Sequence, residues 1–368
     1  MSDIFKTDEF LVNMGPQHPA THGVLRLLLT LNGEVVVRAV PHVGYLHRST
    51  EKILENREYI QVIPFLDRMD YLAAMCNELP YVLAMEKLMN IEVPQRAQTI
   101  RVIIFELNRI VSHVMWWGNF GLELGAFTPM LYGFREREEG LNLFESISGQ
   151  RMTYNYMRIG GVARDLPEDF PKRAKNFMNI VKEKLKDYDD LLTGNIIFQH
   201  RTKDIGIISP ELAISYALSG PMLRGSGIKW DVRKGDPYCG YENYDFEIPV
   251  GKKGDVLDRY MVRYNEIIQS IRIVEQALAK LDSGDIIAKI PKKIAPPKGE
   301  IYFRVESPRG ELGVYIVSDG GTKPYRFKVR APSFCNLSIS EAIMKDCFMA
   351  DLPAIIGSID FILGDVDR

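Results

Sequence analysis

The sequence has 368 residues, of which 46% are hydrophobic and 26% charged, a composition typical of an ordered globular protein. Its 46 lysines and arginines are balanced by 48 aspartates and glutamates, so no basic excess attracts a phosphate backbone and nucleic acid is not an expected partner. The most apolar long run, residues 100–118, contains Arg101, Glu106 and Arg109, which excludes a transmembrane span there. The first residues lack the features of a secretory signal, so we expect a cytoplasmic chain.

The first predicted element is a β-hairpin that follows an irregular loop. Residues 15–23 read Gly-Pro-Gln-His-Pro-Ala-Thr-His-Gly, which prevents regular structure and carries two histidines into the next strand. Residues 24–31 and 34–40 are β-compatible, and Asn32-Gly33 between them supplies the two positive φ angles of a two-residue turn.

Helical periodicity dominates from about residue 45 to residue 281. Apolar residues recur every three or four positions over 100–114, 170–188 and 257–271, which predicts three long helices of a bundle. Residues 220–227 are rich in turn formers and are predicted to be irregular. The basic, proline-rich segment 290–299 is interpreted as a solvated connection, with a partner contact as the alternative.

Short strands are predicted near the C-terminus, over 301–305, 312–318 and 325–330, followed by a helix over 338–344 and an apolar tail. The fold class is therefore α+β and mainly α. We expect one domain with three regions, a loop and hairpin over 1–43, a helical core over 44–285, and strands, helix and tail over 286–368.

Cysteine and histidine spacing does not indicate a metal site. The four cysteines form no close pair, which also argues against a disulfide framework. His18 and His22 are four positions apart, as zinc ligands on a helix are, but Pro19 lies between them and the zincin glutamate is missing. Four of the six histidines fall within residues 18–47, and this clustering favours a function over simple packing.

Two further segments are candidates for chemistry. In Asp67-Arg-Met-Asp-Tyr71, Asp70 is a predicted N-cap, so that Tyr71 starts the next helix and can point its phenol out of the helix mouth; half-buried packing is the alternative. Glu123 is a lone carboxylate in the otherwise apolar stretch 122–129.

Together, several motifs resemble the D-type subunit family of respiratory NADH-quinone oxidoreductase, or complex I, almost from end to end. They are residues 15–23, Gly44-Tyr-Leu-His-Arg-Ser-Thr-Glu51, residues 67–71, Arg158-Ile-Gly-Gly-Val162, Val317-Ser-Asp-Gly-Gly321 and the closing Gly-Asp-Val-Asp-Arg368. The resemblance implies the fold of the large subunit of nickel-iron hydrogenases. It also implies a peripheral place at the cytoplasmic side of the cell membrane.

The hydrogenase metal ligands are not present at the matching positions. Where those enzymes have four cysteines and a histidine, this chain has Asp70, Ala73, Ile362, Asp365 and Arg368. Without thiolates, nickel-iron ligation is not expected, and we expect this chain to bind no metal and no redox centre itself.

The resemblance implies a quinone site instead. By motif position, His22 and Tyr71 are the ligands of the quinone head group, and Glu123 stands where the family usually has an aspartate partner of the histidine. Quinone reduction takes up two electrons and two protons, and an imidazole and a phenol are suitable donors. Glu123 is expected to relay the resulting charge imbalance to proton pumping in the membrane arm.

Two other positions match residues near the terminal [4Fe-4S] cluster of the partner B subunit. Arg48 aligns with an arginine close to that cluster, whereas Thr153 replaces a histidine that many relatives have there. Without a titrating imidazole, we predict a lower and less pH-dependent cluster potential, which suits a low-potential quinone such as menaquinone.

The expected partners are the B, C, I and H subunits, with FMN and NADH bound by distant subunits. Three alternatives stay open. The same subunit can serve a complex fed by ferredoxin or deazaflavin, the chain can be a hydrogenase-type subunit, or it can be a structural scaffold.

Overall fold

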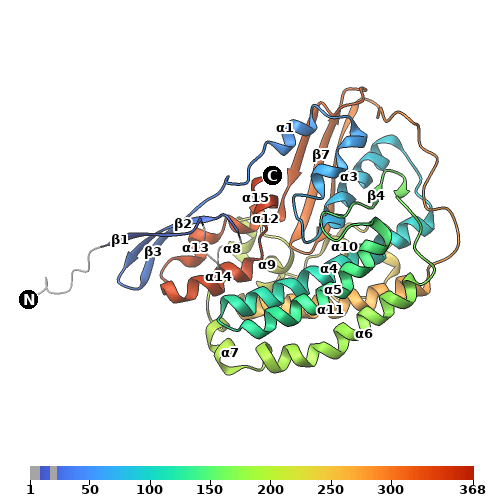
Figure 1. The fold of residues 1–368 in the computed structure, drawn as a ribbon. Helices are drawn as coiled ribbons and strands as arrows, with labels where there is room; N and C mark the ends of the chain where they lie inside the picture. Colours follow the sequence, from blue (N-terminus) through green and yellow to red (C-terminus); the bar gives the residue numbers. More distant parts are fainter. Residues whose placement is uncertain (1–8, 17–22) are drawn as a thin grey trace, which may run out of the picture.

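The computed structural model describes residues 9–16 and 23–368, and four long helices lie side by side along one side of it (Figure 1). They are α4 (Gln95–Glu123), α5 (Phe127–Ser148), α6 (Phe170–Tyr188) and α11 (Val256–Ala279). Each of the three apolar stripes predicted from the sequence falls on one of these helices, so the helical core is confirmed.

The central helix is α4, which is buried on nearly all sides between Thr99 and Val114. It packs very closely on α5 because glycines stand at the contact. A Cβ on Gly133 would lie 2.9 Å from the carbonyl oxygen of Val114, and one on Gly118 would lie 3.0 Å from that of Pro129. A larger residue at either position would force the two helices apart.

The N-terminal sheet extends away from the helices and has the antiparallel order β1 (Phe10–Met14), β2 (Arg26–Asn32), β3 (Val35–His42). The predicted hairpin is confirmed, but its turn is displaced by one residue. Pairing continues through Asn32 and Val35, which leaves Gly33 and Glu34 as the turn, and Gly33 takes the positive φ of 62°. Strand β1 was not predicted from the sequence.

The second three-stranded sheet contains β6 (Gly299–Ser307), β7 (Gly310–Ser318) and β8 (Arg326–Arg330), which confirms the three predicted strands, and both strand pairs are antiparallel. Helix α3 (Ala74–Met89) packs against β6 and β7. Three short elements lead into α3, namely α1 (Thr50–Leu54), η2 (Tyr59–Gln61) and α2 (Ile63–Leu66).

Short elements connect the long helices. They are the ribbon β4 (Met157–Arg158) and β5 (Gly161–Val162), then η3 (Asp189–Thr193), α7 (Ile196–Thr202), α8 (Pro210–Ser215), α9 (Gly220–Gly225), α10 (Val232–Gly235) and η4 (Tyr241–Asn243). The prediction of irregular structure over 220–227 is wrong for α9. Pro221 lies in its first turn, where the missing N–H costs no hydrogen bond.

The C-terminal region is helical. It contains α12 (Pro332–Leu337), α13 (Ser340–Met344), η5 (Met349–Asp351), α14 (Leu352–Ile359) and α15 (Leu363–Asp367). The predicted apolar tail is thus folded into α14 and α15. In the described part of the chain, no helix is long and apolar enough to cross a membrane. The mainly α fold with small sheets near both ends is confirmed.

Candidate functional site

The segment after α14 packs directly against the turn that precedes α3. A Cβ on Gly364 would lie only 2.5 Å from the carbonyl oxygen of Met69. Arg309, in the turn between β6 and β7, joins the two segments: its Nη1 donates to Asp70 Oδ2 at 2.6 Å and its Nη2 to Asp360 Oδ1 at 3.2 Å. One buried guanidinium therefore holds two buried carboxylates that are far apart in the sequence.

Asp70 closes a turn and does not cap α3. Its Oδ1 accepts hydrogen bonds from the backbone N–H groups of Leu72 and Ala73 at 3.2 and 3.3 Å, while α3 begins only at Ala74. The prediction that Asp70 is the N-cap and that Tyr71 starts the helix is therefore wrong. The ion pair with Arg309 fixes the carboxylate so that its second oxygen is used by the turn.

Tyr71 follows Asp70 in this turn and is half-buried. Burial, and then the charge of Asp70, raise its pKa above the usual value, so the phenol stays protonated at neutral pH. Its hydroxyl makes no hydrogen bond with any other described residue. The structure thus offers a phenolic donor that is not already used by the neighbouring side chains.

Asp70, Asp360 and Asp365 are three of the buried carboxylates on the two segments. Asp365 accepts the backbone N–H of Ser333 at 3.0 Å, and burial followed by the charge of Asp70 raises its pKa to about 6. Burial also raises the pKa of Asp70, although Arg309 opposes the shift. Asp360 faces a second cation, since Arg263 Nε lies 3.6 Å from its Oδ2. Asp365 can therefore gain or lose a proton close to physiological pH.

The positions matched to hydrogenase metal ligands lie on these same two segments, which supports the interpretation that they form one place in the fold. They are Asp70, Ala73, Ile362, Asp365 and Arg368. Within residues 9–16 and 23–368, no group of three His, Cys, Asp or Glu side chains is arranged to hold a metal ion. The cation between the carboxylates is a guanidinium.

Glu123 reaches the same C-terminal segment from another side. It is the last residue of α4, and a Cβ on Gly357 of α14 would lie 1.9 Å from its Oε2. Trp116, two turns earlier in α4, donates from Nε1 to the carbonyl of Gly357 at 2.8 Å. Because α14 leads into Asp360, Glu123 packs on the helix that precedes the segment held by Arg309.

His22 and His18 lie outside the described residues. The loop that carries them rejoins the described chain at Gly23, where a Cβ would lie 3.0 Å from Cδ1 of Leu363. The end of this loop is therefore next to α15, the helix that contains Asp365.

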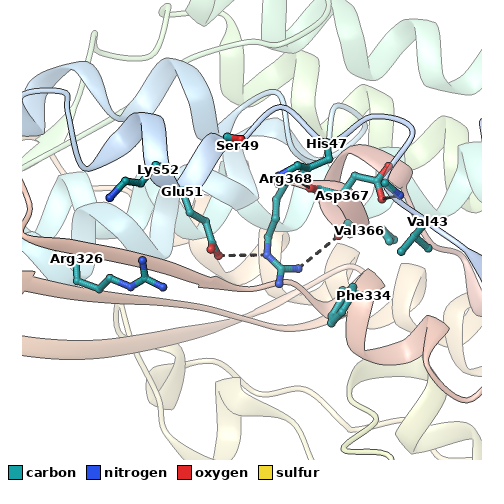
Figure 2. A pocket seen from close by; sticks show the side chains of 11 residues that line it. Val43, His47, Ser49, Glu51, Lys52, Arg326, Phe334, Val366, Asp367 and Arg368 are labelled. Atoms are coloured by element: carbon teal, nitrogen blue, oxygen red, sulfur yellow. Dashed lines mark hydrogen bonds and ion pairs between the residues drawn. The ribbon is translucent and has the colours of Figure 1, made fainter.

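A cleft of about 350 Å³ lies beside the last residues of the chain, and Figure 2 shows the side chains that line it. The carboxylate of Asp367 accepts the backbone N–H groups of Gly44 and Leu46, both at 2.7 Å. Arg368 pairs with Glu51 of α1 at 3.2 Å, so the last residues of the chain are fixed both to α1 and to the connection between β3 and α1. The cleft is consequently bounded by ordered, charged groups.

Another buried carboxylate, that of Asp67, is influenced by the charge of Arg48. Burial raises the pKa of Asp67 to about 6, and the charges of Arg68 and Arg48 oppose the shift. Asn155 donates to Asp67 at 3.3 Å, two residues after Thr153. Thr153 has a φ of 49°, which is rare for a β-branched residue.

Sequence reasoning did not single out Arg309, although it holds the candidate site together. It contacts Asp70 across 239 positions, and such a separation leaves no local spacing to recognise. The only signal is an arginine in the tight turn Ser307-Pro-Arg-Gly310 between two strands.

Comparisons with known proteins show the family of the chain. Residues 123–297 and 289–368 match the family model described as the 49 kDa subunit of respiratory-chain NADH dehydrogenase. The D-type subunit of NADH-quinone oxidoreductase from Desulforamulus reducens is 54% identical over 362 residues, 98% of this chain and 99% of that protein. The protein of the same name in Geobacillus thermodenitrificans is 51% identical over 365 residues, 99% of this chain and all of that protein. The chain therefore belongs to the family of 49 kDa, or D-type, subunits of respiratory-chain NADH dehydrogenase.

Proposed function

We propose that this chain provides the quinone site of a proton-translocating NADH-quinone oxidoreductase. Two electrons from NADH, carried by FMN and iron-sulfur clusters on other subunits, reduce the quinone, and two protons complete the quinol. The observation that carries the proposal is the half-buried phenol of Tyr71, whose hydroxyl has no partner among the described residues and which adjoins the buried Asp70–Arg309 pair.

In this proposal Tyr71 donates a hydrogen bond to one quinone carbonyl oxygen as negative charge develops on it. His22 donates a hydrogen bond to the other quinone carbonyl oxygen, since the loop that carries it ends beside α15. Glu123, on the far side of the C-terminal segment, responds to the loss of protons from the site and relays the charge change toward the membrane arm.

The proposed partners are the B subunit with its terminal [4Fe-4S] cluster, near Arg48 and Thr153, and the C, I and H subunits. The names of the relatives support a multi-subunit oxidoreductase. In this assembly the chain lies at the cytoplasmic side of the cell membrane, attached through its partners.

The test is Tyr71→Phe in the purified complex. The substitution keeps the ring and removes only the hydroxyl, so the complex is expected to assemble. Quinone reductase activity should fall at least tenfold, in line with the factor of about 10² or more that positioned proton donors commonly contribute. Reduction of an artificial acceptor that takes electrons before the quinone should be unchanged.

Tyr325→Phe is the matched control, because Tyr325 is 71% exposed. Full quinone reductase activity in the Tyr71→Phe complex would remove Tyr71 from the site and with it the support for the proposal.

A further inference from the structure

A separate pocket of about 210 Å³ lies between α2, the β4–β5 ribbon and the segment that follows α11. Six isoleucines line it, and we call it the isoleucine pocket: Ile60, Ile63, Ile159, Ile287, Ile290 and Ile294. Ile60 is 63% exposed and Ile287 is 43% exposed, so its rim presents apolar surface to solvent. Such concentrated apolar exposure is typical of a surface that another molecule covers.

The segment 285–298, which forms one wall of the pocket, is held in place by backbone contacts. Val162 donates to the carbonyl of Ile286 at 3.0 Å, and Ala288 donates to that of Gly160 at 2.8 Å. A Cβ on Gly161 would lie 2.0 Å from the carbonyl oxygen of Ile286, so the glycine permits this close approach. The start of the segment is thus a fixed wall, and the prediction of a solvated connection over 290–299 is wrong for Ile294, which is buried.

The surroundings of the isoleucine pocket are positively charged. Segment 285–298 contains one aspartate and four exposed lysines, none of which forms an ion pair with a described residue: Lys289, Lys292, Lys293 and Lys298. Arg158 also lines the pocket, and its guanidinium binds the side-chain oxygen of Asn155 and a backbone carbonyl rather than a carboxylate. A molecule that occupies the pocket with complementary charge is therefore negatively charged.

Prolines restrict how the segment can be recognised. Pro291, Pro296 and Pro297 have no backbone N–H and cannot donate to an added strand. The prolines therefore interrupt strand-like pairing, and side-chain recognition is favoured, with an apolar group in the pocket and carboxylates at the lysines.

We propose that the isoleucine pocket receives an apolar side chain from an acidic segment of a neighbouring subunit. This inference rests on the proposed function, because it requires that the chain works within a multi-subunit complex. The lysines attract the acidic segment and fix its position, and the isoleucines bury its apolar anchor.

The test places a photo-crosslinking phenylalanine derivative at Ile287 in the purified complex and identifies the attached peptide by mass spectrometry. The expected product joins Ile287 to a peptide of another subunit that has several Asp or Glu residues around an apolar one. The matched control is the same derivative at Ile214 of α8, which is 66% exposed. Attachment to a neutral or basic peptide, to a second copy of this chain or to lipid overturns the inference, as does a yield no greater than at Ile214.

Charge reversal tests the role of the lysines. In a Lys292→Glu/Lys293→Glu complex, the yield at Ile287 should fall by about fivefold or more at low salt, since two attractions become repulsions. Lys172→Glu/Lys175→Glu, on exposed positions of α6, should leave the yield unchanged. If the crosslinking yield at position 287 is unchanged in the Lys292→Glu/Lys293→Glu complex, the occupant is not acidic and the inference is overturned. If the complex is active and Ile287 attaches to nothing, only this inference fails; if no other subunit copurifies, the proposed function fails.

Discussion

Glu78 is a carboxyl group buried beneath the loop that carries Thr153. Its Oε2 accepts the backbone N–H groups of Tyr156 and Met157 at 3.1 and 2.7 Å, while Oε1 has no hydrogen-bond partner in the described structure. Burial raises its pKa from 4.5 to about 8 despite these two hydrogen bonds. At neutral pH the folded chain therefore holds a proton on Glu78 that the unfolded chain releases.

This shift predicts a pH dependence of stability with a definite sign. Between pH 4.5 and 8 the folded state binds more protons than the unfolded state, so Glu78 makes the free energy of unfolding fall as the pH rises. The slope for one group is at most about 1.4 kcal/mol per pH unit. Glu78→Gln resembles the protonated acid and does not titrate, so the variant should lose this slope and be more stable than the wild type at pH 8.

Thermal unfolding of the purified chain at pH 5, 6.5 and 8 measures the effect. Glu183→Gln, at an exposed position of α6, is the control and should leave the profile unchanged. Equal slopes for the wild type and Glu78→Gln would show that Glu78 does not hold the extra proton.

At the scale of the elements, the position of Tyr71 depends on how closely α15 packs on the turn before α3. Gly364 has no left-handed φ, so a Gly364→Ala variant has no backbone strain, but its Cβ would lie 2.5 Å from the carbonyl oxygen of Met69. Such overpacking typically costs about 1–3 kcal/mol and moves backbone. Tyr71, two residues after Met69, should be displaced as a result.

We therefore expect Gly364→Ala to lower quinone reductase activity several-fold while the complex still forms. Gly299→Ala is the control, because its nearest neighbour would be Cδ1 of Leu88 at an ordinary 3.6 Å. Steady-state activity of the two purified complexes makes the comparison, and equal activities would argue that α15 does not set the position of Tyr71.

Elements with a local sequence signal could be predicted from the sequence. Helix α6 has a helical period of apolar residues and the β2–β3 hairpin has a turn signal, and both were predicted. Helix α14 was missed because it is only eight residues long and buried on almost every side, so too few turns are present for a helical period to be recognised. At the site, local motifs located Asp70 and Tyr71, whereas Arg309 acts through long-range contacts that no spacing records.

Across the whole molecule, a network of buried charges connects the C-terminal segment with the helical core. Beyond Arg309 and Asp360 it continues through Arg263 of α11, and the same helix carries Glu266, which bonds to both Arg224 and His113. Further pairs extend it to β6 and α10, namely Arg224–Glu306, Arg233–Glu106 and Arg233–Asp231. Because so many charges are desolvated together, removing one partner leaves others uncompensated.

Arg309→Met should therefore be strongly destabilising, by about 3–5 kcal/mol at neutral pH, the usual cost of breaking a buried pair. Exposed pairs contribute far less, so Arg272→Met, which removes a surface pair with Asp245, should cost less than about 1 kcal/mol. Thermal unfolding of the purified chains at pH 7 distinguishes the two variants.

The pH dependence of the Arg309→Met defect identifies its cause. Arg309 lowers the pKa of Asp70, so without it Asp70 is more readily protonated in the folded chain. The folded variant then binds more protons than the folded wild type, and its deficit should shrink as the pH falls from 7 to 5. Adding Asp70→Asn to Arg309→Met removes one uncompensated carboxylate and should recover part of the lost stability at pH 7. A deficit that is constant with pH and not relieved by Asp70→Asn would mean that Arg309 stabilises the core by packing alone.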